Sequence, residues 1–361
     1  MKFMLVKREP LSWMDGISQF LFSLSDALLR LGHEVVCVAS CDSQLATVRQ
    51  NYDFSRYPEI AALSEEHAEY APKLAARLWR RAGKNFVAQH RPDLILLNGA
   101  LPVRFARPTV LIAHDLQQRK FFGDFGRRIF KAVTYRLADQ LVVTCPELVV
   151  PTAKDALCPR GRFLVVPTCI DTQRYTPRPL AERAPVILHL GFIFYKAPRA
   201  TLAAFAAMKN RNARLVLVGR PDAEVAAEIQ ALPAELRGRI EMPGSVSAEK
   251  LKELMGTARI VSVPSHYDLP VASPTVLEAL ASHTPAVVSA GISRLVAADG
   301  ENCFVEDTTA GMARRFDELL ADDETWLKIS AGCAATKLQF DSLTVARQYI
   351  ELAQKLSSKK C

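Results

Sequence analysis

Several features that mark common protein classes are absent from this sequence. No apolar run approaches the roughly 20 residues that a membrane-spanning helix needs. The eight cysteines include no CxxC pair, so buried thiols are favoured over a zinc or redox site. There is no GxGxxG motif, which disfavours a dinucleotide site, and neither an internal repeat nor a low-complexity tract is present. These absences leave an ordinary globular protein as the class to consider.

The first residues differ from a secretory signal peptide. Lys7, Arg8 and Glu9 directly follow the apolar residues of the start MKFMLVKREP, where a signal peptide would continue with an apolar core. With 49% hydrophobic and 23% charged residues, the 361-residue chain is typical of a globular protein of two domains. We therefore expect a cytoplasmic protein, with peripheral attachment to the inner face of the membrane as a further expectation.

Positive charge is concentrated in the first half of the chain. The net charge is +8; residues 1–184 contain 26 Lys and Arg against 18 Asp and Glu, whereas residues 185–361 contain 20 of each. Within residues 73–136, the counts are 14 basic and 3 acidic side chains. This excess predicts an anionic partner.

Two segments mix these basic residues with apolar ones. They are 73–91, with Lys73, Arg77, Arg80, Arg81, Lys84, Arg91, Leu74, Leu78, Trp79 and Phe86, and 119–136, with Lys120, Arg127, Arg128, Lys131, Phe121, Phe122, Phe125 and Phe130. Helices of this kind can lie on an anionic membrane surface. Nucleic acid is an alternative partner for the same charges, and an ordinary solvated face is a third interpretation.

Short β-rich runs alternate with helical patterns in both halves, which is typical of parallel sheets covered by helices. The first half has predicted strands at residues 3–6, 34–39, 93–97, 109–113, 140–144 and 163–166. The second has them at 186–190, 214–218, 239–242 and 260–263, after a proline-containing linker at 172–185. Because ligand-binding loops follow the carboxyl ends of such strands, two tandem sheets can face each other across a cleft.

Polar residues follow two predicted strands of the first half. Asp15 and Gly16 lie just before a helix, and a glycine there lets a ligand approach the backbone closely. His114 and Asp115 directly follow the strand at 109–113, where open sheets keep ligand contacts. A plain turn and a structural histidine are the alternative interpretations of these pairs.

A glycine and two basic residues follow the first strand of the second half. Gly191 permits a tight turn, and Lys196 or Arg199 can reach a phosphate as a point charge or a fork. A solvated lysine is an equally compatible interpretation.

The segment 264–288 predicts a strand end, a polar loop, a capped helix and a second strand. Ser273 suits the N-cap and Pro274 the first helical position. The free N–H groups at this helix start, together with the helix dipole, predict a site for phosphate or diphosphate. Glu278, one turn in, can accept hydrogen bonds from sugar or ribose hydroxyls, and Asp268 supplies a second carboxylate on the loop.

Taken together, these motifs resemble the retaining glycosyltransferases of sequence family 4, which have the two-domain GT-B fold. The resemblance covers nearly the whole chain. It rests on Asp15-Gly16, Gly32-His33-Glu34-Val35, His114-Asp115, Pro167-Thr168-Cys169-Ile170-Asp171 with Tyr175 and Pro177, Pro264-Ser265, Leu277-Glu278-Ala279-Leu280-Ala281 and Pro285-Ala286-Val287-Val288.

The resemblance implies an α/β protein of GT-B type, in which two Rossmann-like domains with parallel sheets face an interdomain cleft. Residues 1–176 are the implied acceptor-binding domain and residues 177–340 the nucleotide-sugar-binding domain, with a C-terminal helix at 341–361 that crosses back to the first domain. The implied activity is transfer of a hexose-type sugar, with retention of configuration, to a lipid-linked or polymeric glycan. No cofactor or metal ion is implied, because a helix start and basic side chains stabilise the leaving diphosphate.

The resemblance also assigns roles to individual residues. His114 contacts the donor sugar near the reacting centre, Glu278 holds the nucleotide ribose, and Lys196 neutralises the diphosphate. The implied catalytic residues are His114, Asp268 and Glu278. The donor-binding set further contains Gly16, Gly191, Arg199, Ser273, Pro274 and Thr275, while Asp15 and Asp115 line the cleft on the acceptor side.

Two other functions stay open from the sequence. The basic region 73–136 is compatible with a glycosyltransferase that acts on DNA or a modified base. Phe192, where the family usually has arginine, is compatible with a non-catalytic relative that binds a nucleotide or a glycan.

Overall fold

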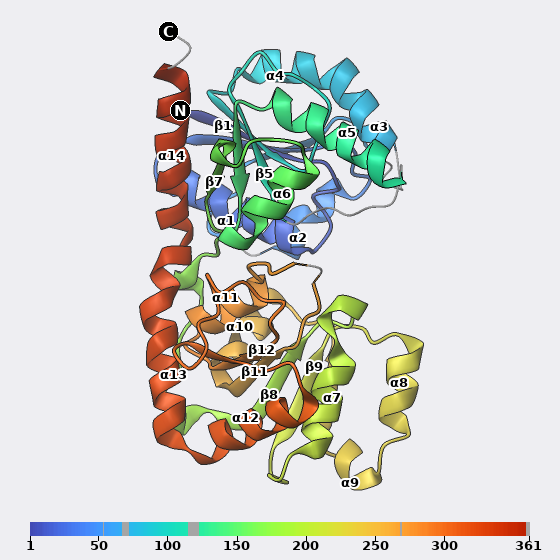
Figure 1. Cartoon of the computed structure of the whole chain (residues 1–361), viewed down its shortest axis with the longest axis vertical. Helices are drawn as coiled ribbons and strands as arrows, with labels where there is room; N and C mark the ends of the chain where they lie inside the picture. Colours follow the sequence, from blue (N-terminus) through green and yellow to red (C-terminus); the bar gives the residue numbers. More distant parts are fainter. Residues whose placement is uncertain (53, 67–71, 115–122, 268, 359–361) are drawn as a thin grey trace. The chain divides into compact units, whose positions relative to one another are not determined.

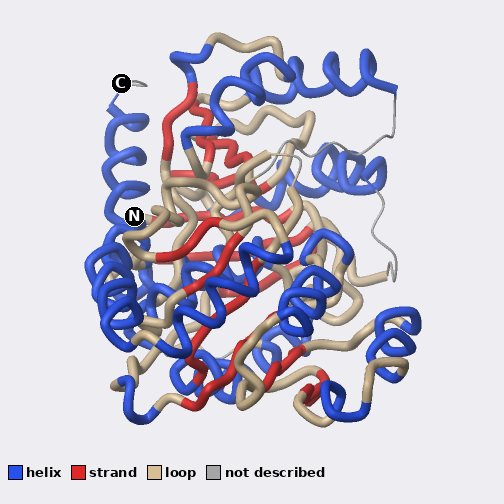
Figure 2. The backbone as a smooth tube through the Cα atoms, turned by 60° about the horizontal axis from the view of Figure 1, so that its bottom comes forward, coloured by secondary structure: helices blue, strands red, loops and turns tan. Residues whose placement is uncertain are grey.

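The computed structural model describes residues 1–52, 54–66, 72–114, 123–267 and 269–358. The chain forms two units. The N-terminal unit comprises Met1–Asp171 together with Asp341–Cys361, and the C-terminal unit comprises Thr172–Phe340. Both units are parallel sheets flanked by helices (Figures 1 and 2).

The N-terminal unit contains a seven-stranded sheet in the order β3-β2-β1-β4-β5-β6-β7, and every neighbouring pair is parallel. The strands are β1 (Lys2–Lys7), β2 (Glu34–Ala39), β3 (Glu59–Ala62), β4 (Leu94–Asn98), β5 (Thr109–Ala113), β6 (Gln140–Val143) and β7 (Phe163–Val165). The order changes direction at β1, so the ends of β1 and β4 flank the topological switch point where open sheets bind ligands.

The helices of the N-terminal unit are α1 (Gly16–Arg30), α2 (Val48–Asn51), α3 (Pro72–Leu78), α4 (Lys84–His90), α5 (Gly123–Leu137), α6 (Val149–Asp155) and α14 (Ser342–Ser358). Because the right-handed crossovers from β1 to β2 and from β5 to β6 run in opposite directions across the sheet, α1 and α5 cover opposite faces. The C-terminal helix α14 packs against α1. Residues from both ends of the sequence therefore complete one core.

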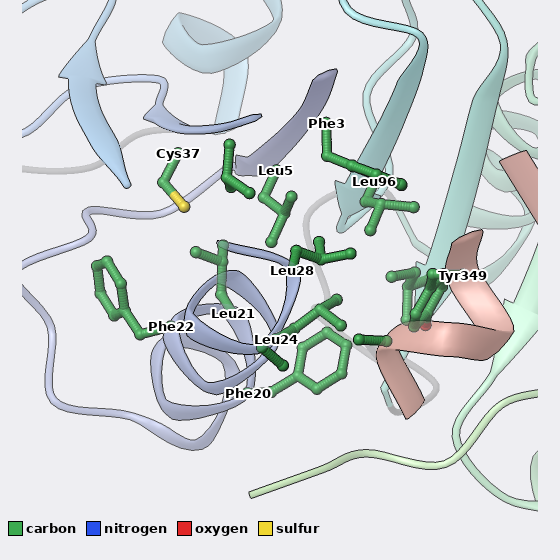
Figure 3. Packing of buried hydrophobic residues seen from close by; sticks show 14 of the residues in the cluster. Phe3, Leu5, Phe20, Leu21, Phe22, Leu24, Leu28, Cys37, Leu96 and Tyr349 are labelled. Atoms are coloured by element: carbon green, nitrogen blue, oxygen red, sulfur yellow. The ribbon is translucent and has the colours of Figure 1, made fainter. Parts of the chain in front are cut away.

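Figure 3 shows this core from close by. Phe20, Leu24 and Leu28 of α1 recur at helical spacing, are at most 1% exposed, and belong to the same cluster as Tyr349 of α14. The helix ends at a left-handed glycine: Gly32 has φ +82°, and its N–H donates to the carbonyl of Leu29 at 3.1 Å. Hydrophobic periodicity thus sets the buried face of α1, and Gly32 marks its end.

The C-terminal unit contains a six-stranded parallel sheet in the order β10-β9-β8-β11-β12-β13. Its strands are β8 (Ala184–Leu190), β9 (Arg214–Val218), β10 (Ile240–Gly244), β11 (Ala258–Val263), β12 (Ala286–Val288) and β13 (Cys303–Val305). Its helices are α7 (Pro198–Ala207), α8 (Ala223–Gln230), α9 (Ala234–Arg237), α10 (Ala248–Thr257), α11 (Pro274–Ala281), α12 (Thr309–Ala321) and α13 (Asp323–Thr336).

The predicted class, two Rossmann-like α/β sheets in tandem, is confirmed. The strand at Glu59–Ala62 was not predicted, because its sequence EIAA is short and its side chains are only partly buried at a sheet edge. The predicted linker at 172–185 contains two short 3-10 turns, Thr172–Arg174 and Leu180–Glu182, and β8 begins at Ala184. Its Arg183 is a buried residue of the C-terminal unit.

Candidate functional site

Asp15 lies at the start of α1, at the N-cap of the helix. Its Oδ1 accepts a hydrogen bond from the Ser18 N–H at 2.8 Å, which satisfies one of the free donors of the first turn. Gly16 is the first residue of the helix. The predicted pair Asp15-Gly16 therefore lies directly after the loop that leaves β1, at the carboxyl end of a central strand.

Lys7, the last residue of β1, is a buried cation beside Asp15. Its Nζ donates to Asp15 Oδ2 at 2.8 Å, to Ser18 Oγ at 2.6 Å and to the carbonyl of Pro10 at 2.9 Å. The Lys7 side chain has no exposed surface, whereas that of Asp15 is 37% exposed. A fully hydrogen-bonded ammonium group thus supports a carboxylate that is accessible to a ligand. The sequence interpretation missed Lys7, which reads as an ordinary lysine at a strand end.

His114 follows β5 and lies in the same N-terminal unit. Its Nε2 lies 2.9 Å from Oδ1 of Asn98, at the end of β4, and its ring meets that of Phe20 edge-on at 5.0 Å between centroids. The pKa of His114 is lowered to about 4, mainly by burial; the Asp15 charge opposes this shift and the Lys7 charge adds to it. The imidazole is therefore neutral near pH 7. Asp15, Lys7, Asn98 and His114 together form what we call the N-unit cluster.

The loop between Lys7 and Asp15 is anchored by its backbone while it exposes two apolar side chains. The Ser12 N–H and hydroxyl donate to Asp42 at 2.9 and 2.7 Å, and the Tyr52 hydroxyl donates to the carbonyl of Trp13 at 2.7 Å. Trp13 and Met14 are 43% and 69% exposed. A fixed loop that presents apolar surface beside Asp15 is suited to contact a ligand.

In the C-terminal unit, Lys196 reaches the start of α11. Its Nζ lies 3.3 Å from the hydroxyl of Thr275, the second residue of that helix. Burial lowers the pKa of Lys196, and the nearby Glu278 carboxylate opposes that change. Gly191, with φ +90°, allows the tight turn that leads from β8 to this lysine.

Glu278 is a buried carboxyl group in the middle of α11, 8% exposed. Burial raises its pKa to about 7, while the hydroxyl of Tyr175, which donates to its Oε1 at 3.2 Å, and the charge of Lys196 oppose the shift. Tyr175 belongs to the motif Pro167–Pro177 on which the family resemblance rests. Lys196, Thr275, Glu278 and Tyr175 form what we call the C-unit cluster.

The start of α11 differs in one detail from the sequence prediction. Ser273 occupies the N-cap and Pro274 the first helical position, but the Ser273 hydroxyl makes no capping hydrogen bond. It is buried and has no hydrogen-bond partner among the described residues, and the same holds for the hydroxyl of Ser265. The prediction that the Ser273 hydroxyl caps the helix is therefore wrong. A helix start with an unused buried hydroxyl beside a lysine is suited to an anion.

Three buried polar side chains support the Gly191 turn and were not predicted from the sequence. His189 Nε2 lies 2.9 Å from the carbonyl of Gly191, and its Nδ1 lies 3.0 Å from the hydroxyl of Thr201. That hydroxyl is 2.8 Å from Ser262 Oγ. Since a carbonyl only accepts, Nε2 carries the proton and Thr201 donates to Nδ1. The chain of contacts joins β8, α7 and β11 beneath the turn.

Arg199 forms ion pairs within the C-terminal unit, and Phe192 lies in the core of that unit. Arg199 is half exposed and forms ion pairs with Glu228 at 2.9 Å and Glu224 at 3.1 Å, both on α8. Two carboxylates thus occupy the guanidinium group, so the prediction that Arg199 joins Lys196 at a phosphate is not supported. Phe192 is 6% exposed in the core of the C-terminal unit and packs against Gly219.

Two predicted site residues, Asp115 and Asp268, lie outside the described residues. Of the others, Asp15, Gly16 and His114 come together in the N-terminal unit, and Gly191, Lys196, Ser273, Pro274, Thr275 and Glu278 come together in the C-terminal unit. Among the residues that the structure describes, no group of three or more His, Cys, Asp and Glu side chains is placed to hold a metal ion.

The basic segment 73–91 folds as α3, one π-helical turn (Trp79–Gly83) and α4. Its cations are all exposed: Lys73, Arg77, Arg80, Arg81, Lys84 and Arg91. Trp79 is instead fully buried and donates from Nε1 to Ser40 Oγ at 3.0 Å. The expectation that Trp79 belongs to an apolar surface is therefore wrong, because the core of the N-terminal unit takes it up. None of the described helices has the length and apolar character that crossing a bilayer requires.

Comparison with protein-family models matches residues 14–174 to the model described as Glycosyltransferase Family 4 and residues 184–322 to the model described as Glycosyl transferases group 1. Comparison with curated proteins finds no match.

The structure is also similar to solved structures. Sucrose-phosphate synthase from Thermosynechococcus elongatus superposes with a TM-score of 0.80 at 18% identity, over 99% of both chains. Anabaena Alr3699/HepE in complex with UDP has a TM-score of 0.75 at 16% identity, over 98% of this chain and 100% of that one. WaaG, a glycosyltransferase involved in lipopolysaccharide biosynthesis, has a TM-score of 0.69 at 14% identity, over 97% and 99%. At these identities the similarity establishes the fold, and the predicted GT-B type is confirmed.

Proposed function

Because this chain belongs to the glycosyltransferases of family 4, we propose that it moves a hexose-type sugar from a nucleoside diphosphate to a lipid-linked or polymeric glycan, with retention of configuration. The observation that supports this most is the C-unit cluster. It combines a partly buried cation with the start of α11 and a buried carboxyl group one turn into that helix. These are the groups that a diphosphate and a ribose require.

The donor binds to the C-terminal unit in this proposal. Lys196 and the N–H groups at the start of α11 face the diphosphate, and Glu278 accepts hydrogen bonds from the ribose hydroxyls. Alr3699/HepE has been crystallised with UDP and with UDP-glucose, which makes uridine nucleotides the first to test. The Tyr175 hydroxyl, already on Glu278 Oε1, holds the carboxyl group in place for the second oxygen to reach the ligand.

The reaction breaks the bond between the anomeric carbon and the diphosphate oxygen. The acceptor hydroxyl oxygen bonds to the same face of that carbon, and its proton passes to the departing diphosphate. Negative charge grows on the diphosphate as the bond breaks, so Lys196 and the α11 dipole stabilise the transition state more than the ground state. These groups supply positive charge without a metal ion.

The N-terminal unit binds the acceptor and the transferred sugar. Asp15, exposed at the start of α1 and supported by Lys7, accepts a hydrogen bond from a sugar hydroxyl, and His114 contacts the transferred sugar. Trp13 and Met14 offer apolar surface to the acceptor beside Asp15.

The membrane part of the proposal rests on the exposed surface of α3, α4 and α5. Six cations of the segment 73–91 are exposed, and α5 exposes Ile129 and Val133, at 46% and 49%, on the same helix as the exposed Arg136. Basic and apolar side chains together favour an anionic lipid surface, where a lipid-linked acceptor is found.

The transfer itself is tested by incubating the purified protein with UDP, GDP and ADP sugars and measuring release of the nucleoside diphosphate. Thermal-shift screening with the same compounds identifies the preferred nucleotide. We expect turnover that Lys196→Met and Glu278→Gln abolish and that Arg199→Met retains. Binding without any turnover, in the presence of glycan acceptors, would instead favour a non-catalytic relative.

The membrane part is tested by sedimentation with anionic liposomes at low salt. Arg80→Glu with Arg81→Glu should reduce the bound fraction, whereas Lys209→Glu with Arg211→Glu, the same charge change on exposed residues of the C-terminal unit, should not. Equal binding of both variants would refute it. Retardation of duplex DNA at about 50 mM salt would favour the nucleic-acid alternative.

A further inference from the structure

His114 is held by two neighbours whose own positions are fixed by the fold. Asn98 ends β4, is 1% exposed, and places Oδ1 at 2.9 Å from His114 Nε2. Phe20 of α1 meets the imidazole edge-on at an angle of 69° between the ring planes. These two contacts with described residues fix the orientation of the ring and place Nε2 in a hydrogen bond.

The amide of Asn98 determines which nitrogen of His114 carries the proton. Asn98 Nδ2 donates to the main-chain carbonyl of Val6 at 3.2 Å. A carbonyl oxygen only accepts, so the amide nitrogen has to face Val6 and the amide oxygen has to face His114. Because that oxygen also only accepts, Nε2 of His114 must be the donor.

We propose that Asn98 is a positioning residue that keeps the proton of His114 on Nε2, so that Nδ1 accepts a hydrogen bond from a hydroxyl of the transferred sugar. This inference rests on the proposed function for the identity of the ligand. A neutral imidazole carries a single N–H, so a proton fixed on Nε2 leaves Nδ1 as an acceptor. An acceptor nitrogen suits a sugar hydroxyl, whereas it would repel the oxygens of a phosphate.

The charged groups around His114 support a neutral ring. The described ones that act on it are Lys7 from β1 and Asp15 from the start of α1, and they bond to each other at 2.8 Å. Their effects on the pKa of His114 oppose one another, so burial dominates and lowers that pKa. The ring is thus an uncharged acceptor at the pH at which cytoplasmic enzymes work.

The proton position is measured directly by long-range 1H–15N correlation on protein labelled at the histidine nitrogens, without any nucleotide sugar. The chain has seven histidines, so the signals of His114 are assigned by their loss in His114→Gln. At pH 7 we expect a protonated Nε2 that exchanges slowly with water and a bare Nδ1. A proton on Nδ1, or a doubly protonated ring, would overturn the inference.

Asn98→Ala tests the positioning role, with Asn302→Ala as the matched control. Asn302 is also a buried asparagine, 2% exposed, but it bonds within the C-terminal unit, to Val296, Ala298 and Thr336. In Asn98→Ala we expect fast exchange of the Nε2 proton and a kcat/KM for transfer lowered about tenfold. Asn302→Ala should leave the His114 signals unchanged. Unchanged His114 signals in Asn98→Ala would refute the role of Asn98.

The two levels of this inference fail in different ways. If His114→Ala transfers sugar at the normal rate, the role of His114 in the proposed function is refuted. The hydrogen bond between His114 Nδ1 and a sugar hydroxyl is then refuted as well. If the spectra place the proton elsewhere while His114→Ala is inactive, the proposed function stands and the assignment of the tautomer is wrong.

Discussion

Replacing Glu278 by Gln is expected to stabilise the protein and weaken donor binding at the same time. The carboxyl group is 8% exposed, and burial raises its pKa from 4.5 to about 7. A shift of this size corresponds to about 3 kcal/mol of unfavourable free energy for the ionised group in the folded state. Gln has no charge to bury.

The sign of this effect follows from where each state loses its proton. Below about pH 4.5 both folded and unfolded protein keep the proton of Glu278, and its pKa shift has no effect on stability. Between about pH 4.5 and 7 only the unfolded state ionises. Above about pH 7 both states are ionised, and the folded state carries the full cost. Glu278→Gln should raise the free energy of unfolding by about 3 kcal/mol at pH 8 and by less than about 1 kcal/mol at pH 5.

Donor binding should change in the opposite direction. A carboxylate that accepts ribose hydroxyls forms charge-assisted hydrogen bonds, so its loss should weaken UDP binding by about 30-fold at pH 8. In the natural protein, affinity should fall about tenfold for each pH unit below 7, since only ionised Glu278 accepts both hydroxyls. Titration of UDP itself affects the natural protein and Glu278→Gln equally, so it cancels in the ratio of their affinities. That ratio should fall from about 30 at pH 8 to about 3 at pH 6.

Urea unfolding at pH 5 and pH 8 and calorimetric titration with UDP between pH 6 and 8 measure these changes. Glu253→Gln is a matched control, because Glu253 is exposed and pairs with Lys250 at 2.9 Å. An equal effect of Glu278→Gln on stability at both pH values, or an affinity ratio independent of pH, would refute the role given to this carboxyl group.

Other predictions concern the diphosphate site, the core and metal ions. Lys196→Met should weaken UDP binding at least tenfold and leave uridine binding unchanged in calorimetry, while Arg199→Met, whose charge is paired, changes neither. Arg183→Lys should lower the free energy of unfolding in urea by about 2–4 kcal/mol, because one ammonium group cannot replace the guanidinium contacts to Ala258, Ser282 and Thr284. Transfer assayed in excess EDTA should keep its rate; loss of activity restored by a divalent ion would show that the positive charge of the C-unit cluster is insufficient.

The helices and strands that carry the two clusters could be predicted from the sequence, because each of them depends on residues that are close together along the chain. The α1 pattern of Phe20, Leu24 and Leu28 needs no distant information, and neither does the glycine that ends the helix. The strand before His114 is a run of buried β-formers, TVLIA, and the structure gives it the predicted bounds, Thr109–Ala113. Patterns within one helix or strand were therefore sufficient for most of the fold.

The contacts that pair distant side chains could not be predicted in the same way. Asn98 and His114 are neighbours only because β4 and β5 pair with Asn98 beside Ile112. Lys7 looks like a solvated lysine until the loop after β1 folds back over it. Arg199 has a charge suited to phosphate, but α8 contributes Glu224 and Glu228, which lie 25 and 29 residues further along the chain.

The division of the chain determines the order in which its two units are completed during synthesis. The C-terminal unit is one continuous segment, Thr172–Phe340, and all its residues are available before α14 is made. The N-terminal unit needs Tyr349 and its neighbours on α14 to cover the α1 side of its core. The unit that is translated first is therefore the last to be finished, and until α14 docks, the core residues that α14 covers are open to chaperones and to other chains.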